Sequence, residues 1–137
     1  MKKLYLAILL MTPIVTLANS CPSVDKVFVK RGNQYIIVPP VGWELQQDKG
    51  KINHLESDDV QFSMAAWGAD LHLPTDADNH VRCYYFGIKN NNNGVSIQTE
   101  TVIQEWQVKS YSQWQYAGPT YYGCGTDLCP FADSIKQ

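Results

Sequence analysis

The densest group of side chains with metal-binding chemistry lies in one short polar segment. Carboxylates and imidazoles recur at close spacing there, and the five ligand-type residues are Asp70, His72, Asp76, Asp78 and His80. Oxygen and nitrogen ligands of this kind can bind a divalent cation, but residues 76–80 lack the glycine and the closing glutamate of a calcium-binding loop. Polar loops are often this acidic because Asp and Asn form turns. We therefore interpret the segment as a solvated loop without metal. A metal-dependent enzyme built on residues 70–80 is the alternative.

Other arrangements that perform catalysis are missing from the sequence. It contains no glycine-flanked serine elbow and no glycine-rich phosphate loop. Asp58 and Asp59 are paired carboxylates, but adjacent residues of a strand point to opposite faces, so we interpret them as surface acids. His54 stands alone on a predicted strand. The sequence therefore predicts a protein that is not an enzyme and that uses no cofactor.

The four cysteines favour disulfide chemistry over metal or redox chemistry. They stand at Cys21, Cys83, Cys124 and Cys129. The last two enclose four residues where a redox motif has two, Pro130 opposes a following helix, and no histidine stands near them for zinc. Paired cysteines in an exported chain predict disulfides, although four cysteines allow three pairings. The favoured pairing is Cys21–Cys83 with Cys124–Cys129.

Export is predicted from the start of the chain. Lys2 and Lys3 precede an apolar run over residues 4–15, and Ala18 and Ser20 supply the small residues of a cleavage site. This order is typical of a secretory signal, and the run is shorter than the roughly 20 apolar residues of a membrane span. We expect residues 1–20 to be a signal peptide and the mature chain to begin at Cys21, in the periplasm or secreted.

Lipidation of Cys21 is the alternative to a soluble mature protein. The residues before it, Ala18-Asn19-Ser20, fit a lipidation site poorly, because a branched apolar residue is usual at the first of these positions. Lipidating Cys21 would also leave one of four cysteines without a partner in an oxidising compartment. We therefore expect a protein that is neither anchored nor transmembrane.

Charge and size restrict the partners. The chain has a net charge of −2, and removing Lys2 and Lys3 with the leader makes the remaining 117 residues more acidic, at −4. A chain of this length forms one domain. Nucleic acids and anionic lipid surfaces attract basic stripes, which this chain lacks. The expected partner is another protein of the envelope, and the sequence does not indicate an oligomeric state.

Short apolar runs separated by turns predict the fold class. Two hairpins are expected, one joining residues 24–29 to 35–38 and one joining 43–45 to 52–55. Alternation over Val60 to Trp67 predicts a half-buried strand, and 81–88 is the most apolar stretch and so a central strand. The return strand over 95–101 follows a turn at residues 90–94, and Thr and Val in 100–108 favour strand over helix. We expect an all-β, disulfide-bonded domain over 21–137: one antiparallel β-sandwich or small barrel of about seven strands.

Aromatic side chains exceed what a core of this size needs. The mature part contains 15 of them, and the last group lies among Gly, Ser and Gln: Tyr111, Trp114, Tyr116, Tyr121 and Tyr122. Exposed Tyr and Trp favour protein partners or sugar faces. We therefore expect Trp114 and either Tyr121 or Tyr122 to be partly exposed in a binding surface, and we assign Trp43 to the core.

A series of short motifs resembles that of small exported proteins of gammaproteobacteria. The motifs are Cys21-Pro22, Tyr35 followed by Gly42-Trp43, Cys83-x-Tyr85, and a closing Cys124…Cys129-Pro130-Phe131. They resemble an uncharacterised family of unknown function found in Legionella and pseudomonads. They also resemble EirA, which is associated with the Dot/Icm type IV secretion system of Legionella and Coxiella. The resemblance spans the mature chain and implies a periplasmic accessory to effector secretion.

Three functional hypotheses follow from the sequence. The leading one is a non-enzymatic accessory or protein-binding module of the periplasm that supports type IV effector secretion. The second is a binder of cell-wall sugar or an inhibitor of a wall hydrolase, because exposed Trp stacks on pyranose rings. The third is the metal-dependent enzyme on residues 70–80.

Overall fold

A computed structural model of the chain shows two antiparallel sheets and two short helices. It describes residues 19–45, 54–56, 59–68, 79–87, 90–118, 121–125 and 129–133. Within these residues nine strands are formed: β1 (Phe28–Arg31), β2 (Gln34–Ile37), β3 (Trp43–Leu45), β4 (His54–Glu56), β5 (Val60–Gly68), β6 (Val81–Gly87), β7 (Asn90–Thr99), β8 (Gln115–Gly118) and β9 (Tyr121–Cys124). The helices are α1 (Val24–Val27) and α2 (Glu105–Lys109).

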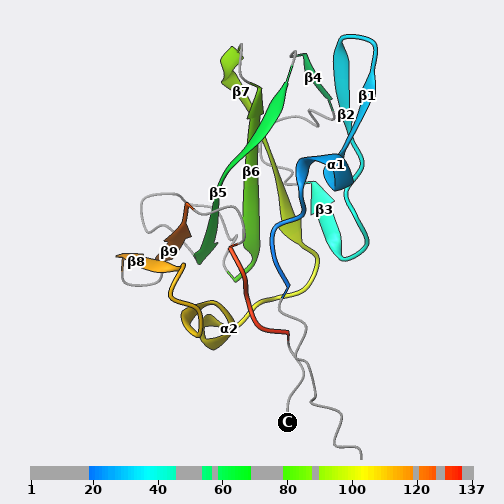
Figure 1. Ribbon diagram of the computed structural model, residues 1–137. Coiled ribbons are helices and arrows are strands. Elements are labelled where there is room, and N and C mark those ends of the chain that lie inside the picture. Colours follow the sequence, from blue (N-terminus) through cyan, green and yellow to red (C-terminus); the bar gives the residue numbers. More distant parts are fainter. Residues whose placement is uncertain are drawn as a thin grey trace, which may run out of the picture.

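The larger sheet contains six strands in the order β3-β7-β6-β5-β9-β8, and the smaller contains three in the order β1-β2-β4. In Figure 1 the strands β5, β6 and β7 run side by side through the centre, the small sheet lies beside their upper part, and α2 lies below with β8 and β9. Neither sheet closes on itself, so the expected all-β fold is confirmed as a sandwich and not a barrel.

The central strand β6 shows how the core forms. Its residues Val81, Cys83 and Tyr85 are fully buried, whereas the alternate residues Tyr84 and Phe86 are only half-buried. The Phe28 ring of the small sheet meets the Tyr85 ring edge-on at 5.4 Å between centroids. The Tyr85 hydroxyl donates a hydrogen bond to the Pro22 carbonyl at 2.5 Å, and burial raises its pKa well above the ordinary value. The two sheets therefore share one core.

Both disulfides form in the favoured pairing. Cys21 bonds to Cys83 across 62 positions of sequence, which ties the segment before α1 to the central strand. Cys124 bonds to Cys129 across 5 positions and fixes the turn after β9. The Cys21 sulfur, which is the atom that lipidation would modify, is bonded to Cys83.

The second predicted hairpin is wrong. Trp43–Leu45 pairs with β7 in the large sheet, with Trp43 opposite Thr99, whereas His54–Glu56 pairs with β2 in the small sheet. The two segments are close in sequence, but each pairs with a strand longer than itself, β7 or β2, and not with the other. The first hairpin is confirmed: Arg31 pairs with Gln34 across a two-residue turn in which Gly32 has φ +61°.

Two predicted strand segments are helical. Val24–Val27 forms α1 where a strand was expected, and Glu105–Lys109 forms α2, which overlaps the end of the 100–108 segment. A capping box begins α2: the Gln104 side chain accepts from the backbone of Gln107, and the Gln107 side chain accepts from the Gln104 N–H at 2.7 Å. This local pairing outweighs the strand propensity of the neighbouring Val and Thr residues.

A β-bulge changes which side chains of β5 face the core. The pairing with β6 shifts register between Phe62 and Met64, so the simple alternation predicted from Val60 to Trp67 is not kept. Met64 is exposed, and Ala65 and Trp67 are buried instead. The bulge thus brings Trp67 into the core, where it meets the C-terminal strands.

Two further differences concern the turns. The asparagine-rich residues 90–94 belong to β7, where Gly94 pairs with Phe86, so the predicted turn there is wrong. Residues 121–124, for which no strand was predicted, form β9 and pair with β5. The antiparallel pairing of β6 with the following strand is confirmed. Among the described helices, neither has the length and apolar character needed to cross a membrane.

Candidate functional site

Helix α2 is held rigidly against the rest of the domain. Gln107 is almost fully buried, and its side-chain amide donates to the Ala132 carbonyl at 2.7 Å. The Ala132 N–H in turn donates to the Gln107 carbonyl at 2.8 Å. Just before the helix, the Ile103 carbonyl accepts a hydrogen bond from the Trp67 indole at 2.7 Å. The short helix therefore depends on tertiary contacts and is fixed by them.

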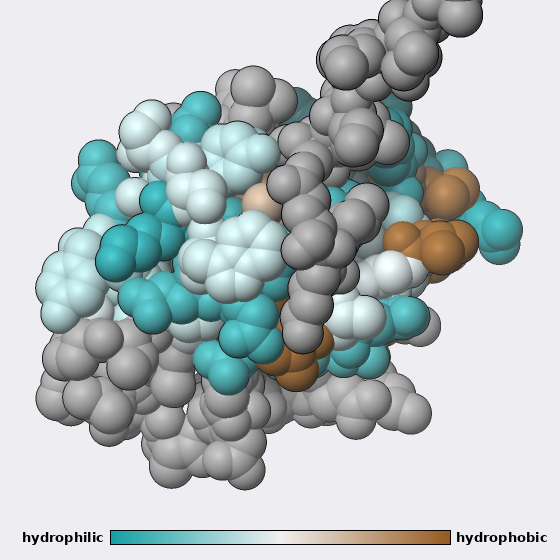
Figure 2. All heavy atoms as spheres, turned by 90° about the horizontal axis from the view of Figure 1, so that it is seen from below, coloured by the Kyte–Doolittle hydropathy of each residue, from teal (hydrophilic) through white to brown (hydrophobic). Residues whose placement is uncertain are grey.

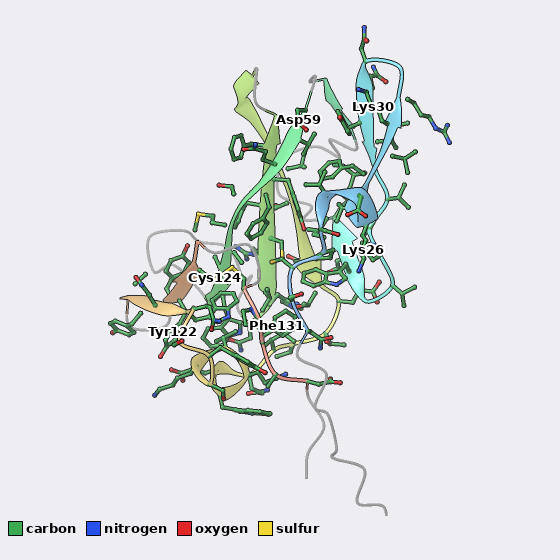
Figure 3. The ribbon with its side chains drawn as sticks, viewed as in Figure 1. Lys26, Lys30, Asp59, Tyr122, Cys124 and Phe131 are labelled. Atoms are coloured by element: carbon green, nitrogen blue, oxygen red, sulfur yellow. A yellow bond between two sulfur atoms is a disulfide. The ribbon has the colours of Figure 1, made fainter. Side chains whose placement is uncertain are left out.

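A row of aromatic rings leads from the core to the surface beside α2. The ring centroids of Trp67 (β5) and Tyr122 (β9) are 6.0 Å apart. The Tyr122 ring meets the Tyr116 ring of β8 edge-on, with 5.8 Å between their centroids. The Tyr122 hydroxyl donates to the Glu105 carboxylate of α2 at 2.8 Å. This hydrogen bond raises the pKa of Tyr122 above its ordinary value of 10.0, with smaller contributions from burial and from the carboxylate charge. Figure 3 shows Tyr122 between the C-terminal strands and α2.

The row ends in one exposed ring, Tyr116, and Trp106 is a second exposed ring on α2. Tyr116 is 65% exposed on β8, and Trp106 is 50% exposed on α2, next in sequence to Glu105. We call these two residues, together with Tyr122 and Glu105, the aromatic surface. On the face seen in Figure 2, the coloured strongly hydrophobic residues lie in small separate patches. A partner that binds near α2 would therefore meet amphipathic rings and not a broad aliphatic patch.

The structure divides the predicted C-terminal aromatic group. Trp114 is only 5% exposed, and its indole donates to the Pro130 carbonyl at 2.6 Å, so the expectation that it is exposed is wrong. Tyr122 is 7% exposed and supports the surface from below. Tyr111 and Tyr121 are half-buried, and Tyr111 packs against the core. Tyr116 is the member of the group that is largely exposed.

Trp106 was missed as a surface residue. The reason is the assignment of residues 100–108 to a strand, which hid its position on a one-turn helix. The signal in the sequence was Gln104 followed by Gln107, which is the spacing of a capping box. Trp43, assigned to the core, is half-buried and meets the Phe131 ring edge-on at 6.2 Å.

A small pocket lies where β3, β7, α2 and the C-terminal segment meet. Its volume is about 150 Å³, and Trp43 and Phe131 form its aromatic wall. Val41, Gly42 and Ile103 add further apolar or backbone wall, and the polar lining residues are Asn19, Thr99, Thr101, Gln107 and Asp133. The Thr99 hydroxyl and the Gln107 amide make hydrogen bonds within the protein. The pocket has room for one small group, and its polar lining suits a hydroxyl-bearing ligand.

The predicted metal-type segment falls almost entirely outside the described residues. Asp70, His72, Asp76 and Asp78 lie outside them, and His80 is the member that the structure places. Its Nδ1 atom is hydrogen-bonded to the Thr99 carbonyl at 2.7 Å. Within the described part of the chain, no three His, Cys, Asp or Glu residues gather as metal ligands.

Comparisons of the chain with protein-family models, with curated proteins and with solved structures find no match.

Proposed function

We propose that this chain is an exported bacterial accessory protein that binds another envelope protein through its aromatic surface. The observation that carries the proposal is the exposure of Trp106 on α2 and Tyr116 on β8. Tyr122 links these two elements, because its ring contacts Tyr116 and its hydroxyl donates to Glu105 of α2. Exposed Trp and Tyr rings are the side chains most enriched among residues that dominate binding energy at protein interfaces. They lose little conformational entropy on binding when the structure beneath them is already ordered.

Hydrogen bonds and ring contacts hold both of the elements that carry the exposed rings. The Tyr122 ring contacts Tyr116, and its hydroxyl is bonded to Glu105 next to Trp106. The Gln107–Ala132 hydrogen bonds fix α2 to the C-terminal segment. The rings therefore have defined positions before any partner arrives, which favours a specific interaction over a nonspecific apolar contact.

The biological setting of the proposal comes from the motif resemblance. Its residues imply a periplasmic accessory to a type IV secretion system, and the two disulfides are compatible with an oxidising compartment. In this setting the partner is a protein of the secretion machinery or of the envelope around it. Binding through a small surface suits an accessory that associates with a larger assembly.

A pull-down with matched variants tests the proposal. Trp106→Ala and Tyr116→Ala should each weaken binding to a partner captured from periplasm by about 30-fold or more, because an anchor ring contributes roughly 2 kcal/mol or more. Val29→Ala is the control, because Val29 is also exposed (46%) but lies on β1. Circular dichroism melts should show all three variants folded. Equal retention of partners by the three variants would refute the aromatic surface as the binding site.

The polar pocket favours cell-wall sugar as a second candidate function. Trp43 and Phe131 provide ring faces, and Thr101 and Asn19 add polar groups beside them. Co-sedimentation with purified peptidoglycan distinguishes this function from protein binding. Retention that is lost with Trp43→Ala and kept with Trp106→Ala would support the sugar hypothesis over the protein-binding one.

A further inference from the structure

Two positions near the end of the leader meet the small-residue rule for signal cleavage. Ala18 and Ser20 permit cleavage before Cys21, and Thr16 and Ala18 permit it before Asn19. The sequence rule therefore does not choose between the two. The structure does distinguish what each cleavage would leave at the new chain end.

Asn19 takes part in the fold. It forms an antiparallel bridge with Phe131, and its carbonyl accepts a hydrogen bond from the Phe131 N–H at 2.7 Å. Phe131 is only 2% exposed, so its N–H lies on a residue with little access to water. Removing Asn19 would take away the partner of this donor, and an unsatisfied buried donor destabilises the folded state.

Cys21 is a poor place for a chain end. It is only 6% exposed and is fixed by its disulfide to the fully buried Cys83. A new α-ammonium group on this residue would lie at the edge of the core, where a charge without a partner is unfavourable. Asn19 is exposed, so an ammonium group there would remain in water. Asn19 also lines the same pocket as the Asp133 carboxylate, which has the opposite charge.

We propose that the leader is removed between Ala18 and Asn19, so that the mature chain keeps Asn19, which forms the bridge with Phe131, and Ser20 after it. This moves the processing site two residues upstream of the position before Cys21. It also separates Cys21 from the chain end, and lipidation requires a cysteine at that end. The cysteine is then left to form its disulfide.

The mass of the exported protein tests the proposal directly. The full chain is expressed with its own leader, recovered from the periplasm, and measured by intact mass after reduction, with N-terminal sequencing. We expect a chain that begins at Asn19, heavier by one asparagine and one serine than a chain that begins at Cys21. A predominant chain beginning at Cys21, or a lipid adduct on it, would overturn the proposal.

Two matched substitutions sharpen the test without depending on folding. Thr16→Phe places a large ring three positions before the proposed cut, and Ser20→Phe places the same ring immediately before the rival cut. Immunoblots of precursor and processed protein should show Thr16→Phe accumulating as precursor or shifting to Cys21, and Ser20→Phe processed like the wild type. Processing blocked by Ser20→Phe and unaffected by Thr16→Phe would refute the assignment.

A stability measurement checks the physical reason. A mature form beginning at Cys21 is exported behind a different leader and compared with the form beginning at Asn19. Because it lacks the partner of the Phe131 N–H, its Tm should be lower by about 4–8 °C. Equal melting temperatures would show that the bridge does not support the fold, which would remove the structural reason for the proposal.

Discussion

Two tryptophans, Trp106 on α2 and Trp114 shortly after it, have opposite roles. Trp114 is 5% exposed and makes a hydrogen bond to Pro130, whereas Trp106, eight positions earlier, is 50% exposed. Both stand among polar residues in the sequence, and their surroundings in the chain do not distinguish them. The difference arises because Pro130, which follows the Cys124–Cys129 disulfide, folds back over Trp114, while nothing described covers the outer side of Trp106. Whether a ring in this region is exposed therefore depends on contacts with residues distant in sequence and not on local composition.

Replacing the two tryptophans should give the largest contrast. Trp114→Ala should destabilise the domain by about 3–5 kcal/mol, because it removes a buried aromatic side chain. Trp106→Ala should change stability by no more than about 0.5 kcal/mol, as for other surface substitutions. Denaturant unfolding of both variants, followed by circular dichroism, measures the two values. Similar losses in both would mean that Trp106 is also part of the core.

The two disulfides offer the next contrast. Replacing both cysteines of the Cys21–Cys83 pair by serine should cost about 4 kcal/mol from the loop of 62 positions, against about 2 kcal/mol for the Cys124–Cys129 pair. The second replacement should also loosen Pro130 and expose Trp114. Thermal melts give the order of stability, and tryptophan fluorescence of the second variant should shift to the red. A reversed order of melting temperatures would contradict the loop-entropy argument.

The hydrogen bond beneath the aromatic surface should have the smallest effect. Tyr122→Phe removes the donor to Glu105 and should lower the Tm less than either change above. The raised pKa of Tyr122 means that its neutral form stabilises the fold fully below pH 10, and that this stability is lost as the pH rises through the raised value. The wild-type protein should therefore lose more stability above pH 10 than Tyr122→Phe does. Melts between pH 8 and pH 11 measure the difference, and identical pH profiles would contradict it.

The fold class and the central strand were predictable because they depend on local pattern. The apolar run over 81–88 contains β6, and a two-residue turn with a glycine at positive φ forms the β1–β2 hairpin. The pairing of β3 was not predictable, because its partner β7 lies more than 50 positions away and three residues carry little pattern. The same holds for β9 (Tyr121–Cys124), which is four residues long and whose partner β5 lies far earlier in the sequence.

The sequence predicted that aromatic residues of the C-terminal part form the surface, but not which of them are exposed. Tyr116 belonged to the predicted group, but Trp114 and Tyr122 turn inward and Trp106 takes their place outside. A bulge in β5 and a one-turn helix decide this arrangement, and both change which side chain faces outward without changing the composition. Sequence periodicity alone does not report either feature over so few residues.

The bridge between Asn19 and Phe131 also makes the domain suitable for circular permutation. Because residues from the two ends of the described chain are hydrogen-bonded neighbours, a short linker could join them without crossing the molecule. The chain could then be opened at the exposed Gly32–Asn33 turn, which tolerates a break better than a paired strand does. For the same reason the domain could be inserted as a cassette into a loop of a carrier protein. Its two junctions would lie together on one side of the domain, as the ends of an insertable unit must.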